Sequence, residues 1–118
     1  DFPKLKIIIA HGGGYLPYYS GRTDKAYESR PETKKNITRR PSDYLSKFYY
    51  DTVIFDGDML SPLIKKAGID NVMMGSDYPR GEVEENPISF IETSLNMSQS
   101  NKDKIMGINA KRLFNLTI

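Results

Sequence analysis

The stretch LKIIIAHGGGYLPYYSGR, residues 5–22, joins a buried-strand pattern to a run of glycines and contains the only histidine of the chain. Residues 5–10 form a short, nearly continuous apolar run, which is typical of a strand covered on both faces in a parallel sheet. His11 follows at the carboxyl end of this predicted strand. The three glycines after it indicate a turn, from which the chain enters a helical stretch at about residue 18.

Two more strands are predicted further along the chain. Residues 48–55 are aromatic and β-branched, and residues 71–76 run into Asp77-Tyr78-Pro79, where the proline ends the ladder. Helical patterns fall between and after the strands, over residues 18–29, 42–47, 58–67, 87–95, 101–107 and 109–115, with Gly68 as a helix stop. This alternation predicts an α/β fold with a parallel sheet and right-handed crossovers. The polar segment 23–40, broken at Pro31, is expected to be a solvated excursion.

Length, charge and composition narrow the class of protein. The 118 residues suffice for one small domain or part of one, and no apolar stretch is long enough to cross a membrane. A net charge of +2 is far below what binding to duplex nucleic acid requires, so nucleic acid is not an expected partner. The absence of cysteine excludes disulfides and thiolate metal sites and is typical of a reducing compartment, which predicts a cytoplasmic protein.

Polar residues stand where the predicted strands end: His11, then Asp51 or Asp56, then Asp77. In parallel α/β structures the functional groups gather at these carboxyl ends, because the connecting loops open there. His11 fits either a turn histidine bonded to backbone, or a general base or metal ligand. Asp77 fits either a turn cap or a ligand for a divalent cation. One histidine and scattered aspartates cannot supply the three protein ligands of a catalytic zinc site.

The glycine run and the arginine after it also allow two interpretations each. Gly12 begins either a flexible turn or a loop whose backbone N–H groups approach an anion without a Cβ in the way. The run matches neither a P-loop nor a dinucleotide fingerprint. Arg22 is expected to pair on a helix surface with Asp24 or Glu28, unless it binds a ligand.

Taken together, FPKLKIIIAHGGGYLPYYSGR, PSDYL, FYYDT, NVMMGSDYP and NAKRLFNL, in this order, resemble the C-terminal part of amidohydrolase-related proteins, in the branch typified by aminocarboxymuconate-semialdehyde decarboxylase. The resemblance covers nearly the whole chain. It implies a (β/α)₈ barrel that holds a divalent metal, commonly zinc, through a His-x-His pair on the first strand, a later histidine, and an aspartate that ends the eighth strand.

The resemblance also implies roles for individual residues. Asp77 corresponds to the metal-binding aspartate. His11 corresponds to the catalytic histidine after the sixth strand, which in the decarboxylases is placed to activate metal-bound water and to transfer protons. Arg22 corresponds to an arginine that in some members reaches the active site of a neighbouring subunit and holds a substrate carboxylate. Gly12 is expected to bind substrate as well, on the interpretation of its loop as one that approaches an anion.

The chain departs from the family pattern because it contains neither a His-x-His pair nor any second histidine. His11 and Asp77 are 66 positions apart, which corresponds to two βα units of about 31 residues each. Residues 1–118 are therefore expected to be the C-terminal portion of a single barrel domain, about strands six to eight, whose partner is the rest of the barrel or another copy. Alone, this portion is expected to be inactive.

Three functions remain open at this point. The first is decarboxylation of a small unsaturated or aromatic carboxylic acid by the complete enzyme. The second is hydrolysis of a lactone or amide by the same kind of metal site. The third is a non-catalytic α/β binding module, in which His11 and Asp77 have no chemical role.

Overall fold

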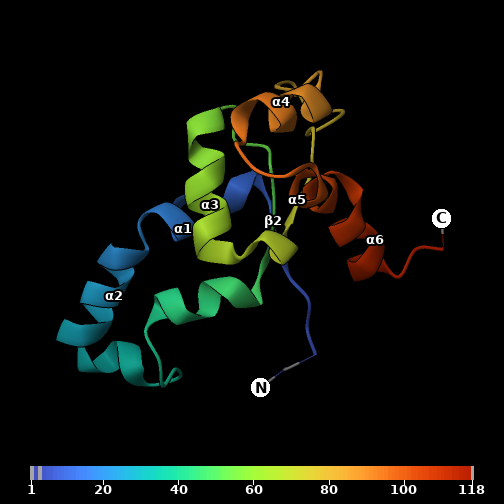
Figure 1. The fold of residues 1–118 in the computed structure, drawn as a ribbon. Helices are drawn as coiled ribbons and strands as arrows, with labels where there is room; N and C mark the ends of the chain where they lie inside the picture. Colours follow the sequence, from blue (N-terminus) through green and yellow to red (C-terminus); the bar gives the residue numbers. More distant parts are fainter. Residues whose placement is uncertain (1, 3, 118) are drawn as a thin grey trace.

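A sheet of three parallel strands lies at the centre of the computed structural model, which describes residues 2 and 4–117 (Figure 1). The strands β1 (Ile8–Ile9), β2 (Tyr49–Asp51) and β3 (Val72–Met73) are ordered β1-β2-β3, with Ile8 paired to Tyr49 and Tyr50 paired to Val72. The predicted parallel sheet is confirmed. The strands are shorter than predicted, because β1 and β3 each pair with only one neighbour in the described part of the chain.

The segment between β1 and β2 is more helical than its polar sequence suggests. Two helices, α1 (Tyr15–Tyr18) and α2 (Ser20–Ser29), meet at Tyr19 where one helix over 18–29 was predicted. The segment from residue 23 is helical as far as Ser29, as the predicted helix over 18–29 required, and only the residues after Ser29 leave that helix. Beyond the break at Pro31 come two 3₁₀ helices, Pro31–Lys34 and Pro41–Lys47, the second in place of the predicted helix over 42–47.

Helix α3 (Leu60–Ala67) connects β2 to β3 and covers the sheet. Leu60, Leu63 and Ala67 lie on one face of the helix and are completely buried. The chain leaves the helix at Gly68, whose φ of +88° is in the left-handed region that a glycine adopts at little cost. Both the helix and its glycine stop match the sequence prediction.

The C-terminal third of the chain is helical. Helix α4 (Pro87–Ser94) is capped by the side chain of Asn86, which accepts a hydrogen bond from the N–H of Ser89. The predicted helices over 101–107 and 109–115 form one continuous run instead, made of α5 (Gln99–Asp103), a π-helical turn over Lys104–Ile108, and α6 (Asn109–Phe114).

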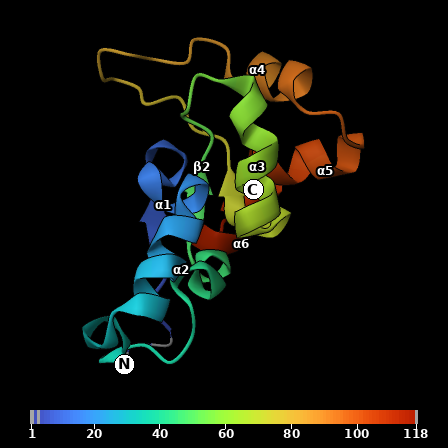
Figure 2. The same ribbon diagram turned by 90° about the vertical axis from the view of Figure 1, so that its left-hand side faces the viewer.

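The hydrophobic core lies between the sheet and these helices (Figure 2). Its members come from β2, α3, β3, α4 and the C-terminal run: Tyr50, Leu60, Leu63, Ala67, Val72, Ile91, Leu95 and Ile105. Tyr50 is completely buried, and its hydroxyl donates a hydrogen bond of 2.8 Å to the carbonyl of Leu45.

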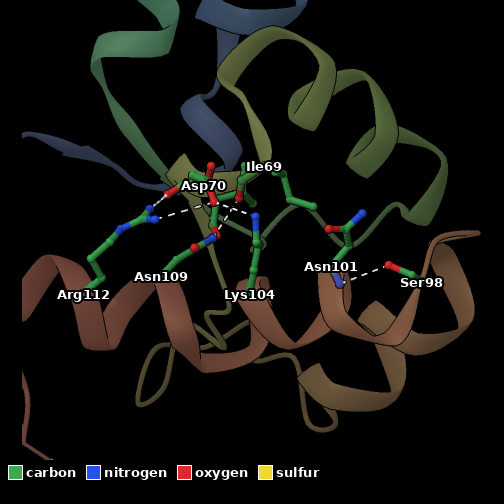
Figure 3. Close-up of polar contacts among 8 residues, drawn as sticks. Ile69, Asp70, Ser98, Asn101, Lys104, Asn109 and Arg112 are labelled. Atoms are coloured by element: carbon green, nitrogen blue, oxygen red, sulfur yellow. Dashed lines mark hydrogen bonds and ion pairs between the residues drawn. The ribbon is translucent and has the colours of Figure 1, made fainter.

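Polar side chains fasten the C-terminal run to the start of β3 (Figure 3). The amide nitrogen of Asn109 donates to the carbonyls of Ile69 and Val72, both at 2.8 Å. The Asp70 carboxylate accepts Lys104 at 3.1 Å and lies 3.6 Å from Arg112. The hydrogen bond from Lys104, with the charges of both cations, lowers the pKa of Asp70.

Strand β1 is an unpaired edge with exposed apolar residues, as expected if the chain is part of a barrel from which the preceding strand is missing. Strand β1 was expected to be covered on both faces, yet Ile7 and Ile8 are each 42% exposed and Leu5 is 61% exposed. The exposure arises because no described element packs on the outer side of β1, which is an edge of the sheet.

None of the helices in the described part of the chain combines the length and the apolar character that a membrane span needs.

Candidate active site

The site is built where the strands end. His11 follows β1 and Asp77 lies four residues after β3, and the sheet order brings both to the same edge. The imidazole Nε2 of His11 lies 3.6 Å from Oδ1 of Asp77. The His11 side chain is 64% exposed and the Asp77 side chain 23%. Two of the four predicted site residues are therefore neighbours in space.

The backbone at this edge adopts an unusual conformation. Four non-glycine residues among those described have positive φ, and three belong to the site: His11 at +56°, Phe55 at +52° and Asp77 at +62°. Each such residue costs roughly 1 kcal/mol or more and persists only where the surroundings impose it. Strain of this kind concentrates at functional sites, and here it occurs once after each strand.

The carboxylate of Asp51, at the end of β2, holds the loop that carries His11. Its Oδ2 accepts the N–H of His11 at 3.0 Å, and its Oδ1 accepts the N–H groups of Gly12 at 2.9 Å and Val53 at 3.0 Å. The backbone N–H of Gly12 thus binds an anion, but that anion is a carboxylate of the protein itself. A contact between Gly12 and a substrate remains a prediction.

Close packing explains why the first two residues after His11 are glycines. A Cβ on Gly12 would lie 2.2 Å from Cγ2 of Ile54, and a Cβ on Gly13 would lie 2.7 Å from the ring of Tyr50. Both residues also have positive φ, +60° and +82°. The loop therefore packs so closely against β2 and the residues after it that only glycine fits at these two positions.

A cavity of about 480 Å³ opens in front of the His11–Asp77 pair. Its polar lining consists of His11, Asp56, Asp77 and Glu82, and the last two belong to the loop between β3 and α4, which Figure 2 shows extending from the body of the molecule. Its apolar lining comes from Tyr18, Val53, Ile54, Phe55 and Met59. Apolar walls with a few convergent polar groups are the usual composition of a small-molecule site.

Tyr18, on α1, places a buried hydroxyl at this cavity. The oxygen has no hydrogen-bond partner among the described residues, although its ring lies in the cavity wall. Burial raises the pKa of Tyr18, and the negative charges of Asp51 and Asp56 raise it further. The hydroxyl therefore stays protonated and can act as a donor.

Arg22 lies apart from this pair. It is exposed on α2, in a separate cavity whose basic lining also includes Lys25 and Arg30. The expected surface pairs are not the observed ones, because Glu28 pairs with Arg40 at 2.7 Å and Asp24 accepts hydrogen bonds from Ser42. Within one copy of the chain, Arg22 does not line the cavity of His11 and Asp77. Its contact with a substrate remains a prediction.

The donors present fit part of a divalent-metal site. Carboxylate oxygen and neutral imidazole nitrogen are both ligands for such ions, and Asp77 and His11 offer them side by side. In the described part of the chain, however, no three His, Cys, Asp or Glu side chains gather closely enough to hold a metal. A complete site would need ligands from outside these residues.

In barrels of parallel strands the active-site residues lie at the carboxyl ends of the strands, which is where His11 and Asp77 lie in this sheet. Comparison with known proteins gives the family directly. The amidohydrolase family pattern matches residues 1–116, and the chain belongs to this family.

The relatives that match the chain include decarboxylases. The chain is 32% identical over 115 residues to 2-amino-3-carboxymuconate-6-semialdehyde decarboxylase of Dictyostelium discoideum, a match covering 97% of this chain and 32% of that protein. It is 31% identical over 118 residues to gamma-resorcylate decarboxylase of a Polaromonas species, covering 98% of this chain and 36% of the relative. The chain thus spans about a third of the length of these relatives.

Solved structures agree with this assignment. The crystal structure of dihydroxybenzoic acid decarboxylase from Polaromonas, with bound manganese and the inhibitor 2-nitroresorcinol, superimposes with a TM-score of 0.82 at 31% identity. The match covers 99% of this chain and 36% of that one. The fold of residues 2 and 4–117 is therefore a piece of the fold of amidohydrolase-family decarboxylases.

Sequence reasoning missed three features of the site. Asp51 was one of two alternatives at the second strand end. Its hydrogen bond to the backbone N–H of His11 joins residues 40 positions apart, which no local pattern indicates. Tyr18 was expected only as the start of a helix. Glu82 belongs to a loop without periodic pattern, and nothing in its neighbours marks it as part of the cavity wall.

Proposed function

We propose that residues 1–118 form the C-terminal portion, about strands six to eight, of a (β/α)₈-barrel decarboxylase that uses a divalent metal. Family membership, the decarboxylase names of the relatives and a match to about a third of their length support this proposal. So do the exposed apolar residues of β1, because a neighbouring strand and a barrel interior would cover them. The substrate class is a small aromatic or unsaturated carboxylic acid.

The observation that carries the proposal is the 3.6 Å approach of His11 to Asp77 at the carboxyl ends of the strands. Asp77 would be a metal ligand, completed by histidines from the strands outside this chain. When bound, a divalent metal supplies a positive charge that orients the substrate and stabilises negative charge as it develops. Zinc is the metal implied by the family resemblance, while manganese is the ion in the Polaromonas structure.

His11 would transfer the proton. Decarboxylation of an aromatic acid breaks the bond between the ring carbon and the carboxylate carbon, releases CO₂ and leaves the electron pair on the ring carbon, which takes up a proton. The exposed imidazole faces the cavity and can supply that proton from Nε2.

The remaining predicted residues would bind the substrate. Arg22 can hold a carboxylate in a bidentate manner, and since it lies outside the cavity of its own chain, it would act in the site of a neighbouring copy. Gly12 would contact the substrate through atoms other than its N–H, which Asp51 binds. The apolar wall of Ile54, Phe55 and Met59 would pack against the ring of the substrate.

The test is a turnover assay of the complete enzyme that contains this chain, with 2,6-dihydroxybenzoate as the probe. CO₂ release and formation of resorcinol are measured together. We expect both products in equal amounts, and loss of at least about a hundredfold in kcat for His11→Ala. Arg80→Ala, in the loop that carries Asp77 but outside the cavity lining, is the matched control.

If the enzyme releases neither product from any hydroxybenzoate and instead hydrolyses a lactone or amide, the decarboxylase proposal is wrong and the hydrolase alternative holds. The same assay on residues 1–118 alone should give no turnover, because the described residues hold no complete metal site.

A further inference from the structure

The His11–Asp77 pair spans two strands that do not touch each other. His11 extends from β1 and Asp77 from β3, while β2 lies between them in the sheet. No hydrogen-bond ladder connects β1 directly to β3. The distance between the two side chains must therefore be set at the end of β2, where Asp51 is the last residue of the strand and Thr52 follows it.

Asp51 fixes the His11 side of the pair. One carboxylate accepts three backbone N–H groups, from His11, Gly12 and Val53, at 2.9 to 3.0 Å. Two of these N–H groups belong to successive residues with positive φ, a conformation that turns neighbouring N–H groups toward one anion. Hydrogen bonds to a charged acceptor are stronger than neutral ones, so they can hold His11 in its strained conformation.

Thr52 fixes the Asp77 side. Its side chain is buried, and its Oγ1 accepts the N–H of Gly75 at 3.2 Å. Gly75 lies two residues before Asp77. The backbone there also rests on Asp51 itself, since a Cβ added to Gly75 would lie 3.1 Å from Cβ of Asp51 and 3.0 Å from Cγ2 of Val53. A side chain at position 75 would push the Asp77 loop away from β2.

We infer that Asp51 and Thr52 are a pair of positioning residues that together set the separation of the His11 imidazole and the Asp77 carboxylate. Neither side chain lines the cavity, and each acts through backbone that it binds. That this positioning matters for catalysis rests on the roles proposed above for His11 and Asp77. The geometric claim is independent of metal and of turnover.

The experiment is NMR on the isotopically labelled 118-residue chain without metal. Because His11 is the only histidine, its imidazole signals are assigned without ambiguity. Two readouts are compared between variants: the amide proton shifts of His11, Gly12 and Gly75, and the cross-relaxation peak between the His11 ring and the β-protons of Asp77. Thermal unfolding of each variant is followed by circular dichroism to confirm that it is folded.

Four variants separate positioning from charge and from general stability. In Asp51→Asn one carboxylate oxygen becomes an amide donor, so the His11 and Gly12 amide protons should move upfield and the His11–Asp77 peak should disappear. Thr52→Val keeps the shape but removes the acceptor, so the Gly75 amide should shift and the same peak should be lost. Thr52→Ser restores a hydroxyl and should restore the peak. Asp56→Asn removes a charge from the same cavity, while its amide oxygen can still accept the N–H of Asp58, and it should leave all readouts unchanged.

Retention of the His11–Asp77 peak in folded Asp51→Asn or Thr52→Val would overturn the inference, as would loss of the peak in Asp56→Asn. If Asp51→Asn does not fold, the contrast between Thr52→Val and Thr52→Ser decides the matter. Failure of this test leaves the proposed decarboxylase function standing, because that function is judged by product formation.

Discussion

The His11 imidazole and the Asp77 carboxylate approach to 3.6 Å although 66 positions separate them and neither lies within a strand. Each follows the carboxyl end of an outer strand, and each has a left-handed backbone conformation. Strained backbone residues cluster at functional sites, so the convergence of these two on one cavity supports its assignment as the candidate site.

Replacement of Gly12 by alanine should destabilise the chain strongly. The new methyl group would meet Ile54 at 2.2 Å, and the residue would keep a φ of +60°. Overpacking and left-handed strain together should lower the free energy of unfolding by about 3 kcal/mol, measured by urea denaturation. Gly21→Ala is the matched control: it lies in α2 with nothing within 4 Å of the added methyl, and should stabilise by up to about 1 kcal/mol. Equal effects at both positions would contradict the packing described for the His11 loop.

Alkaline pH should weaken the fold through Tyr50. Burial raises the pKa of Tyr50 to about 12, whereas in the unfolded chain it ionises near 10. The folded state therefore favours the neutral phenol, so this contribution is complete below pH 10 and is lost as pH rises from 10 toward 12. The loss amounts to about 3 kcal/mol, checked by urea denaturation across this range.

Tyr50→Phe is the control for that measurement. It lacks the ionising group and should show a shallower decline between pH 10 and 12, although it starts lower because the carbonyl of Leu45 loses its 2.8 Å hydrogen bond. A parallel decline in the two proteins would show that other groups dominate the alkaline transition.

The side-chain amide of Asn109 should contribute strongly to the free energy of unfolding. It is almost completely buried and donates to the carbonyls of Ile69 and Val72, which ties the C-terminal run to β3 (Figure 3). Asn109→Ala leaves both carbonyls without this donor and should lower the free energy of unfolding by about 3 kcal/mol, measured by thermal or urea denaturation.

Asn101→Ala, in α5 of the same helical run, provides the comparison, because Asn101 donates to the hydroxyl of Ser98 through its backbone N–H and not through its side chain. That change should alter stability by no more than about 0.5 kcal/mol. Comparable losses for the two asparagines would contradict the fastening of β3 through Asn109.

The sequence predicts the order of elements and much of the site, because both follow from local patterns. Period and apolar character indicate three strands with helices between them, and α3 with its Gly68 stop appears where the pattern puts it. That His11 and Asp77 lie close together could also be predicted, since strand ends in a parallel sheet meet at one edge.

What the sequence could not predict depends on contacts between distant segments. The break between α1 and α2 at Tyr19 and the π-helical turn before Asn109 have no marker in residue type. Asp51 looks like any aspartate that ends a strand until the His11 loop folds onto it. The exposure of Ile7 and Ile8 is likewise invisible locally, because it depends on which other elements pack on β1.

The content of bound metal tests most directly whether His11 and Asp77 serve one metal-dependent site in different roles. The complete enzyme and its His11→Ala and Asp77→Ala variants are purified in parallel, and bound divalent metal is measured by elemental analysis alongside turnover. We predict that His11→Ala retains its metal while kcat falls at least about a hundredfold, and that Asp77→Ala loses metal as well as activity. Equal loss of metal from both variants would make His11 a ligand and contradict its assignment as the proton-transfer residue.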